Sequence, residues 1–245
     1  MTSTAIHLPD SKTKKSAKAA PPPAPVEAVV IGVSAGGIKA LGTILPALPA
    51  DYPVPILVVI HLPPSRKSIV ADLFEEKCRL EVREAEDKEE LTAGVVYFAP
   101  PDYHLLVETD RSLSLSSEEP VMFSRPSIDV LFETAAEAYG EGLLGIILTG
   151  ANPDGALGLK AVAAAGGRAI VQTPAHAYAP AMPEAALQSC PEAAAMDLEE
   201  IAAYLQKVVI LGAQTPLGSP HSRRRAFALA KLRKGSLESQ KVVIL

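Results

Sequence analysis

Residues 28–37 read AVVIGVSAGG, and this stretch decides the fold. A short run of apolar, mostly β-branched residues that ends in glycine is typical of a strand buried on both faces of a parallel sheet. The next residues, IKALGTILPAL, predict a helix. We therefore expect a strand, a glycine-rich turn and a helix, the repeating unit of a doubly wound α/β domain.

The same alternation recurs on both sides of a less regular middle region. PILVVIH at 55–61 predicts a second buried strand, and a helix with a serine cap follows within 65–78. Residues 79–123 hold short alternating segments separated by Gly, Pro or Asp, which predict strands in a mixed or hairpin region. The later elements are a helix at 127–139, a strand at 143–150, a helix at 155–165, a strand at 168–173 and helices at 183–190 and 197–208. The predicted fold class is α/β: a doubly wound, mostly parallel sheet with helices on both faces (three layers, α/β/α) and a short antiparallel hairpin region in the middle.

Composition divides the 245 residues into three parts. Residues 1–26 are rich in Lys, Ala and Pro and predict a disordered tail, residues 27–206 predict one folded domain, and residues 207–245 form a basic extension. The central part carries 26 acidic and 11 basic residues, although the whole chain has a net charge of only −5. An acidic body argues against nucleic acid as a partner, because phosphate binding needs a positive face.

Targeting features are lacking in the sequence. No apolar run approaches the roughly 18 residues of a membrane span, and the N-terminal residues do not resemble a secretory signal. The two cysteines, Cys78 and Cys190, fit neither a disulfide framework nor a cysteine metal site. We expect a cytoplasmic protein that does not span a membrane.

The turn at 32–37, GVSAGG, is the first candidate for chemistry. It satisfies G-x-S-x-G, which exposes a serine hydroxyl, here Ser34, at the carboxyl edge of the sheet beside a helix N-terminus. The same residues could form a glycine-rich anion cradle, although Ser34 stands where the second glycine of G-x-G-x-x-G would be. A plain tight turn is the third interpretation.

A serine nucleophile needs a base, and His61 ends the second predicted strand at the same edge. Asp154 lies in the turn after the strand at 143–150, where its carboxylate could accept the Nδ1 proton of His61. Taken alone, His61 has a structural interpretation and Asp154 could simply cap the next helix. An α/β-hydrolase arrangement would instead use the order Ser, Asp, His with His176 as base, but it needs several strands before the serine.

Six blocks, in this order and spacing, resemble the bacterial chemotaxis protein-glutamate methylesterases, the CheB family. They are VVIGVSAGGIKAL, VVIHLPPS, GVVYFAPPDYHLLV, SRPSIDVLFETAAEAYG, GIILTGANPDGALGL and AGGRAIVQ, and they span roughly residues 27–206. The resemblance implies a catalytic domain with Ser34 as nucleophile, His61 as base and Asp154 as the third member of the triad.

The resemblance also implies an activity and its partners. The expected activity is a serine esterase and hydrolase of chemotaxis signal transduction, which removes γ-methyl esters from glutamates on cytoplasmic chemoreceptor helices, releases methanol and deamidates receptor glutamines. Backbone N–H groups near Ala35 and Ala151 would stabilise the oxyanion. No cofactor and no metal are expected.

The sequence departs from the family pattern at several places. Ala35 and Ala151 stand where Thr and Met are common, and Pro153 restricts the backbone before Asp154. Only 26 residues precede the domain, where studied members carry a receiver domain. The implied enzyme is therefore constitutive or controlled by a separate partner in trans.

Other polar residues have weaker interpretations. Arg125 and Asp129 match a family block near the cleft, where Arg125 could bind an acidic receptor segment or form a surface ion pair or cap. We expect His104 to pack at a strand start, and Asp102 with His104 lacks a third metal ligand nearby in the sequence.

Two functions remain beside the esterase. A nucleotide- or phosphate-binding protein would use the glycine-rich turn as a cradle, but no acidic residue for a ribose follows about 20 residues on. A non-catalytic adaptor of the same fold would bind a signalling partner through the tails.

Overall fold

The computed structural model describes residues 24–61 and 69–212 of the chain. Its main sheet has seven strands in the order β3-β4-β2-β1-β7-β8-β9, and every pairing is parallel. These strands are β1 (Ala28–Val33), β2 (Ile56–Ile60), β3 (Glu81–Glu84), β4 (Val95–Phe98), β7 (Leu143–Ile147), β8 (Arg168–Gln172) and β9 (Ala194–Met196). A separate antiparallel hairpin joins β5 (His104–Val107) to β6 (Leu113–Ser116).

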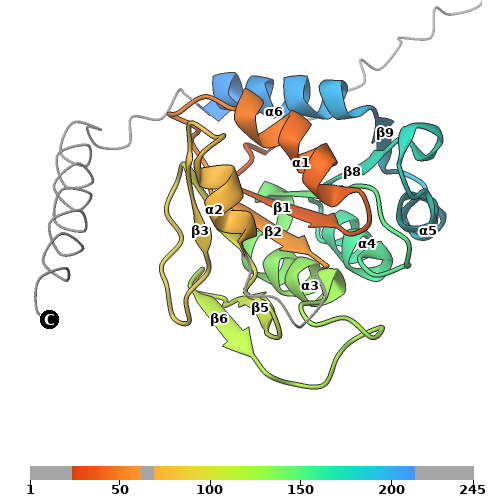
Figure 1. Ribbon diagram of the computed structural model, residues 1–245, viewed down its shortest axis with the longest axis horizontal. Coiled ribbons are helices and arrows are strands. Elements are labelled where there is room, and N and C mark those ends of the chain that lie inside the picture. The colour runs from red at the N-terminus through yellow and green to blue at the C-terminus, as the bar shows by residue number, and fades with distance from the viewer. Residues whose placement is uncertain (1–23, 62–68, 213–245) are drawn as a thin grey trace, which may run out of the picture.

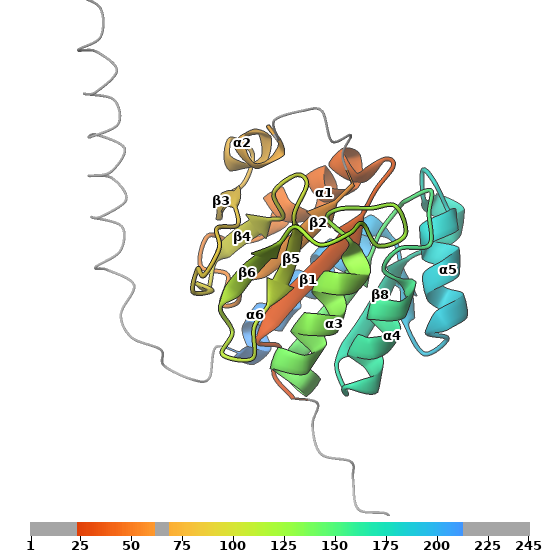
Figure 2. The same ribbon diagram turned by 90° about the horizontal axis from the view of Figure 1, so that it is seen from below.

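Helices cover both faces of the sheet (Figure 1; Figure 2). One face packs against α1 (Gly37–Ile44), α2 (Val70–Glu75) and α6 (Leu198–Gly212). The other packs against α3 (Ile128–Tyr139), α4 (Ala156–Ala164), α5 (Ala181–Ser189) and the β5–β6 hairpin. Three short 3₁₀ helices complete the described elements: η1 (Leu45–Ala47), η2 (Gly140–Gly142) and η3 (Pro174–His176). The predicted three-layer α/β/α fold with a small antiparallel hairpin is confirmed.

Strand β1 lies at the centre of the sheet because both of its faces are apolar. All six of its residues are buried. Val29, Ile31 and Val33 point into the core beneath α1, whereas Ala28 and Val30 point into the core beneath α3. Each buried aliphatic side chain of this size contributes about 1.5–3 kcal/mol. A continuous apolar run, rather than an alternating one, is what such a position requires.

The middle region differs in part from the expectation. Only β5 and β6 form a hairpin, while β3 and β4 join the edge of the main sheet as parallel strands. Strand β9, with the sequence AAM, was not anticipated because it contains no β-branched residue. Helix α6 continues to Gly212, past the expected domain end at residue 206.

Some expectations lie outside the described residues. These are the N-terminal tail up to residue 23, the serine cap of the helix before Val70 and the basic segment from residue 213 onward. Helix α2 begins at Val70 and has no side-chain cap at Ile69.

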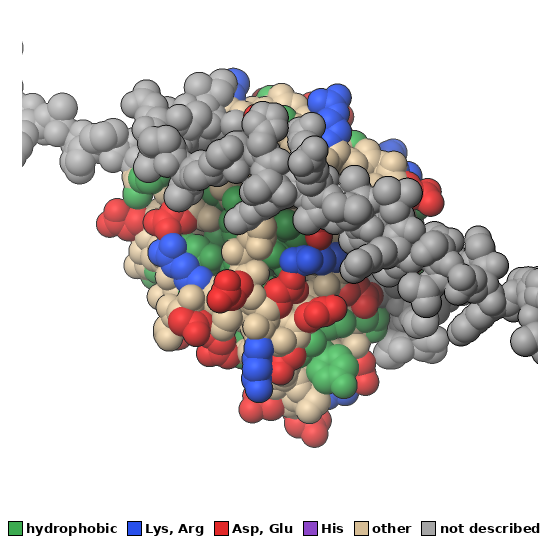
Figure 3. Space-filling model, turned by 90° about the vertical axis from the view of Figure 1, so that its left-hand side faces the viewer, with side chains coloured by type: hydrophobic (Ala, Val, Ile, Leu, Met, Phe, Trp, Pro, Cys, Tyr) green, Lys and Arg blue, Asp and Glu red, His purple; other side chains and the backbone are tan. Residues whose placement is uncertain are grey.

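The described surface is acidic on the side that carries β3 and the β5–β6 hairpin, where Asp and Glu side chains gather (Figure 3). Within residues 24–61 and 69–212, no helix has the length and apolar character needed to cross a membrane.

Candidate active site

Three neighbouring strands end at the same edge of the sheet, and each is followed by a candidate residue. Ser34 comes after β1, His61 after β2 and Asp154 in the turn after β7. Backbone hydrogen bonds extend the parallel pairing past the strand ends: Ser34 N–H donates to Thr149 O at 2.9 Å, and His61 N–H to Val33 O at 3.1 Å. The strand order β2-β1-β7 therefore brings the three segments together at the carboxyl edge, where ligands of open α/β sheets bind.

The turn that carries Ser34 requires glycine at position 36. Gly36 has a φ of +82° and precedes α1 as its N-cap, and Gly37 N–H donates to Ser34 O at 2.9 Å. A Cβ at Gly36 would lie 2.7 Å from the Cβ of Tyr178 in the connection after β8. The turn is thus sharp and closely covered on one side, which leaves Ser34 half-buried.

Thr149 fixes this turn to the neighbouring strand. Its hydroxyl donates to Ala35 O at 2.8 Å and accepts from Ala179 N–H at 2.8 Å. Its backbone N–H donates to the side-chain oxygen of Gln172 at 2.9 Å. Thr149 lies in the block GIILTGANPDGALGL, but no local pattern indicates that its hydroxyl holds the serine turn.

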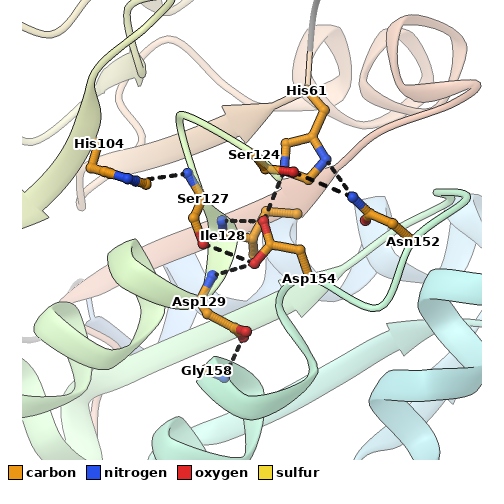
Figure 4. A network of polar contacts seen from close by, with 9 residues as sticks. All are labelled: His61, His104, Ser124, Ser127, Ile128, Asp129, Asn152, Asp154 and Gly158. Atoms are coloured by element: carbon orange, nitrogen blue, oxygen red, sulfur yellow. Dashed lines mark hydrogen bonds and ion pairs between the residues drawn. The ribbon is translucent and has the colours of Figure 1, made fainter. Parts of the chain in front are cut away.

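Asp154 is fully buried and accepts four hydrogen bonds (Figure 4). The Ser127 hydroxyl (2.9 Å) and Asp129 N–H (3.0 Å) reach Oδ1, while Ile128 N–H (2.8 Å) and His61 Nε2 (2.8 Å) reach Oδ2. The carboxylate thus sits on the N-terminus of α3, where backbone N–H groups and the helix dipole favour a negative charge.

These donors decide the ionisation of Asp154. Burial alone would raise the pKa of its carboxyl, but the hydrogen bonds from His61, Ile128 N–H and Asp129 N–H outweigh burial and hold the pKa below its ordinary value. Asp154 is therefore an anion at neutral pH. It does not cap α4, whose N-cap is Gly155 and has no side-chain hydrogen bond.

Two glycines let α3 approach closely enough to hold this carboxylate. A Cβ at Gly32 would overlap the side chain of Ile128, the first residue of α3. A Cβ at Gly155, which has a φ of +94°, would lie 2.6 Å from both Ile128 Cγ2 and Ile147 Cδ1. Ile128 therefore packs between β1 and the start of α4, and its N–H faces Asp154.

The His61 ring is oriented differently from the expectation. Nε2, not Nδ1, contacts Asp154, and Nδ1 faces the side-chain nitrogen of Asn152 at 3.4 Å (Figure 4). This orientation follows from the burial of Asp154 against α3. Nε2 is the ring nitrogen farther from the backbone of His61, so it is the one that reaches the buried carboxylate. Since an ionised carboxylate can only accept, Nε2 carries the proton and Nδ1 has the free lone pair.

The expected contact of about 3 Å between Ser34 Oγ and His61 is absent. Among the described residues, no hydrogen bond involves the Ser34 hydroxyl. Catalytic hydrogen bonds are often longer without substrate and tighten when it binds. The His61–Asp154 half of the predicted triad is in place, and the assignment of Ser34 stays a prediction.

Asn152 is a polar neighbour that sequence reasoning missed. Its Nδ2 lies 3.4 Å from both His61 Nδ1 and Ser124 Oγ. Its Oδ1 is buried and has no hydrogen-bond partner among the described residues. Asn152 therefore lies beside the ring nitrogen that is free to take a proton.

Arg125 closes a loop beside the site. Nε and Nη2 contact Asp102 Oδ1 at 3.0 and 2.6 Å, and Nη1 donates to Ser117 O and Glu118 O at 2.9 Å each. These contacts correspond to the ion-pair interpretation, and substrate binding by Arg125 stays a prediction.

Ala35 and Ala151, the predicted oxyanion residues, flank the site on the turns after β1 and β7. Ala35 is half-buried and Ala151 is exposed. Within the described part of the chain, no acceptor takes a hydrogen bond from the backbone N–H of either residue. Both groups are therefore free to donate to a substrate oxygen.

Two carboxylates and a histidine nearby have structural partners. Asp102 pairs with Arg125, and both ring nitrogens of His104 contact backbone groups. Asp129 is buried and accepts from Gly158 N–H at 2.7 Å. Burial raises the pKa of Asp129 to about 6, the Gly158 N–H lowers it and the charge of Asp154 raises it.

His176, the base of the alternative arrangement, is engaged elsewhere. Its Nδ1 contacts Asp197 Oδ1 at 2.7 Å, and the pair is exposed. The carboxylate that faces His61 is Asp154, so the order Ser, His, Asp matches the structure better than Ser, Asp, His.

Comparison with known proteins gives one consistent answer. The family model of the CheB methylesterase matches residues 29–205. A relative from Leptospira interrogans, provisionally named protein-glutamate methylesterase/protein-glutamine glutaminase, is 51% identical over 176 residues, which are 72% of this chain and 91% of the relative. A relative of that name from Archaeoglobus fulgidus is 39% identical over 71% of this chain and 51% of its own length.

A solved structure agrees with these sequence matches. The CheB methylesterase catalytic domain of Thermotoga maritima superposes with a TM-score of 0.72 at 33% identity and covers 76% of this chain and 100% of that domain. The match supports the esterase over the nucleotide-binding and adaptor hypotheses. The chain belongs to the CheB methylesterase family.

Proposed function

We propose that this protein is a serine esterase that hydrolyses glutamate γ-methyl esters on methylated chemoreceptors and releases methanol. The observation that carries the proposal is the buried His61–Asp154 pair at 2.8 Å, beside Ser34 on the neighbouring strand end. The names of the relatives supply the substrate class.

The proposed mechanism begins with His61 Nδ1. Because Nε2 of His61 keeps its proton and donates it in a hydrogen bond to Asp154, Nδ1 takes the proton of Ser34 as the hydroxyl attacks the ester carbonyl. Asn152 must release Nδ1 for this step, which its long 3.4 Å contact permits. Asp154 then stabilises the imidazolium.

The oxyanion of the tetrahedral intermediate needs donors at the same edge. We assign them to the backbone N–H groups of Ala35 and Ala151; a donor of this kind is typically worth roughly 3–4 kcal/mol. Methanol leaves with the proton from Nδ1, and water then hydrolyses the acyl-enzyme with His61 again as base. A glutamine side chain would follow the same path with ammonia as leaving group, which accounts for the glutaminase activity in the relatives' names.

A protein substrate suits the surface around the site. The large hydrophobic side chains that are exposed in the described residues lie on the connections after β2, β4, β6 and β8, or in the first turns of α1 and α4. They are Ile38, Ile69, Tyr103, Met122, Phe123, Leu157 and Tyr178. Exposed apolar side chains near the carboxyl edge of the sheet suit contact with another protein. We assign this edge to a cytoplasmic receptor helix and to any regulatory partner that acts in trans.

Methanol release from a methylated receptor tests the proposal. Ser34→Ala and His61→Ala should each lower the rate at least a thousandfold, because nucleophile and base act as a unit. His176→Ala, a histidine with its own aspartate, should keep the wild-type rate. Full activity in Ser34→Ala would overturn the proposal. A nucleotide that raised the melting temperature of wild type but not of a Gly36 variant would favour the phosphate-cradle hypothesis instead.

A further inference from the structure

Ser127 links the site to a buried histidine on the hairpin. Ser127 is the N-cap of α3 and is fully buried. Its hydroxyl donates to Asp154 Oδ1 at 2.9 Å, and its backbone N–H donates to His104 Nδ1 at 3.1 Å. His104 begins β5, outside the main sheet, and is 2% exposed.

The partners of His104 define its tautomer. A backbone N–H can only donate, so Nδ1, which faces Ser127 N–H, has no proton. A carbonyl oxygen can only accept, so Nε2, which lies 3.1 Å from Glu119 O, carries the proton. Both ring nitrogens are therefore used, and the neutral ring is fixed in one orientation.

We propose that His104 is a positioning residue for the catalytic pair, acting through Ser127 on Asp154. The proposal rests on the proposed function, because it concerns the same site. The chain of contacts runs from His104 through Ser127 and Asp154 to His61 (Figure 4). By holding the N-cap residue, His104 places the hydroxyl of Ser127 and the first N–H groups of α3 against the Asp154 carboxylate.

The position of this carboxylate matters because His61 meets it with a single nitrogen. At metal sites, partners that orient a ligand typically change affinity or activity 10- to 100-fold when removed, and we expect an effect of this order here because a catalytic pair also depends on held geometry. Each hydrogen-bond donor on Asp154 also attracts part of the negative charge of the carboxylate. The carboxylate then attracts less strongly the imidazolium of His61 that forms during the reaction. Removing the Ser127 hydroxyl should therefore strengthen the attraction of Asp154 for a protonated His61, and so slow the chemistry at low pH.

Ser127→Ala tests the link to Asp154. We expect kcat for methyl-ester hydrolysis to fall about tenfold with KM within twofold, and the acid limb of the kcat/KM profile to move to higher pH. Ser112→Ala is the matched control, because its hydroxyl bonds Asp110 at 2.7 Å before β6, at the end of the hairpin away from His104. A Ser127→Ala enzyme with wild-type kcat and an unmoved acid limb would overturn the proposal.

Two variants of His104 separate positioning from simple anchoring. His104→Asn puts an acceptor where Nδ1 stands and can still bind Ser127 N–H, whereas His104→Gln puts a donor near Nε2 and can still bind Glu119 O. We expect His104→Asn to keep at least half of the wild-type kcat and His104→Gln to fall about as far as Ser127→Ala. Rescue by Gln and not by Asn would mean that His104 only anchors the loop at Glu119, and would refute the role.

A readout that needs no turnover keeps the two proposals apart. In NMR spectra of the full chain, the Nε2 proton of His61 should shift in Ser127→Ala and in His104→Gln, but not in His104→Asn or Ser112→Ala. If wild type releases no methanol, the proposed function fails, while this pattern still decides the positioning role. An Nε2 resonance unchanged in all four variants would refute it.

Discussion

Among the residues that the structure describes, two histidine–aspartate pairs have almost equal length but very different surroundings. His61 Nε2 lies 2.8 Å from Asp154, with side chains that are 13% and 0% exposed. His176 Nδ1 lies 2.7 Å from Asp197, with side chains that are 64% and 37% exposed. Distance alone does not distinguish the two pairs.

The pKa of the carboxyl does not distinguish them either. The pKa of Asp197 is lowered by hydrogen bonds from Thr173 and His176, and that of Asp154 is lowered as well. The difference lies in what surrounds the charge. Asp154 is fixed by three further donors from α3 and excluded from water, so it can hold His61 in one orientation. Solvent competes with every contact of the exposed pair.

The largest expected effect is on catalysis. Asp154→Asn should lower the rate of methanol release by roughly 10³–10⁴, because an amide in this place favours the wrong tautomer of His61. Asp197→Asn, the same change in the exposed pair, should leave the rate within twofold. Comparable losses in the two variants, measured with one methylated receptor, would mean that burial does not set the roles.

A smaller effect concerns stability and Asp129, which adds a second carboxyl beside Asp154. Because burial raises the pKa of Asp129 to about 6, the folded protein keeps a proton that the unfolded chain loses near pH 4. The free energy of unfolding should therefore fall as the pH rises from about 4 to 6, by roughly 1–3 kcal/mol. In Asp129→Asn, which keeps the acceptor for Gly158 N–H, this fall should disappear.

Urea unfolding between pH 3 and 7 checks this sign. Asp197→Asn is the matched control, because the folded pKa of Asp197 is lowered and its contribution is lost as the pH falls. The differences from wild type should therefore slope in opposite directions for the two variants. If both differences sloped in the same direction with pH, the raised pKa of the buried Asp129 carboxyl would be contradicted.

The smallest effect is expected from the exposed pair itself. His176→Ala should lower the melting temperature by about one degree at low salt, and the difference should vanish in 1 M NaCl because screening weakens exposed ion pairs. A larger shift that persists in high salt would show that this pair is structural after all.

Sequence patterns predicted the fold where burial leaves a clear pattern of apolar residues. The run at 28–33 matches β1 residue for residue, because a strand covered on both faces must be apolar throughout. The alternating segments at 81–84 and 95–98 show only that they are extended, so their parallel pairing with the main sheet could not be seen. The sequence of strand β9, AAM, has no pattern that is typical of a strand.

The sequence indicates where the candidate site residues lie, but it does not indicate their contacts. Ser34, His61 and Asp154 follow from their places after apolar runs. Two of the four donors that hold Asp154 are backbone N–H groups of α3, which any residue could supply. The ring nitrogen that meets Asp154 depends on depth in the fold, which no local pattern records.

The parallel ladder of β2, β1 and β7 has a consequence for how this site varies among relatives. Adjacent strands lie about 4.8 Å apart whatever side chains they carry, because main-chain hydrogen bonds set that interval. The paired strands therefore set the distance between the backbones that carry the hydroxyl of Ser34 and the imidazole of His61. Exchange of interior side chains should therefore leave the backbone interval between residues 34 and 61 unchanged.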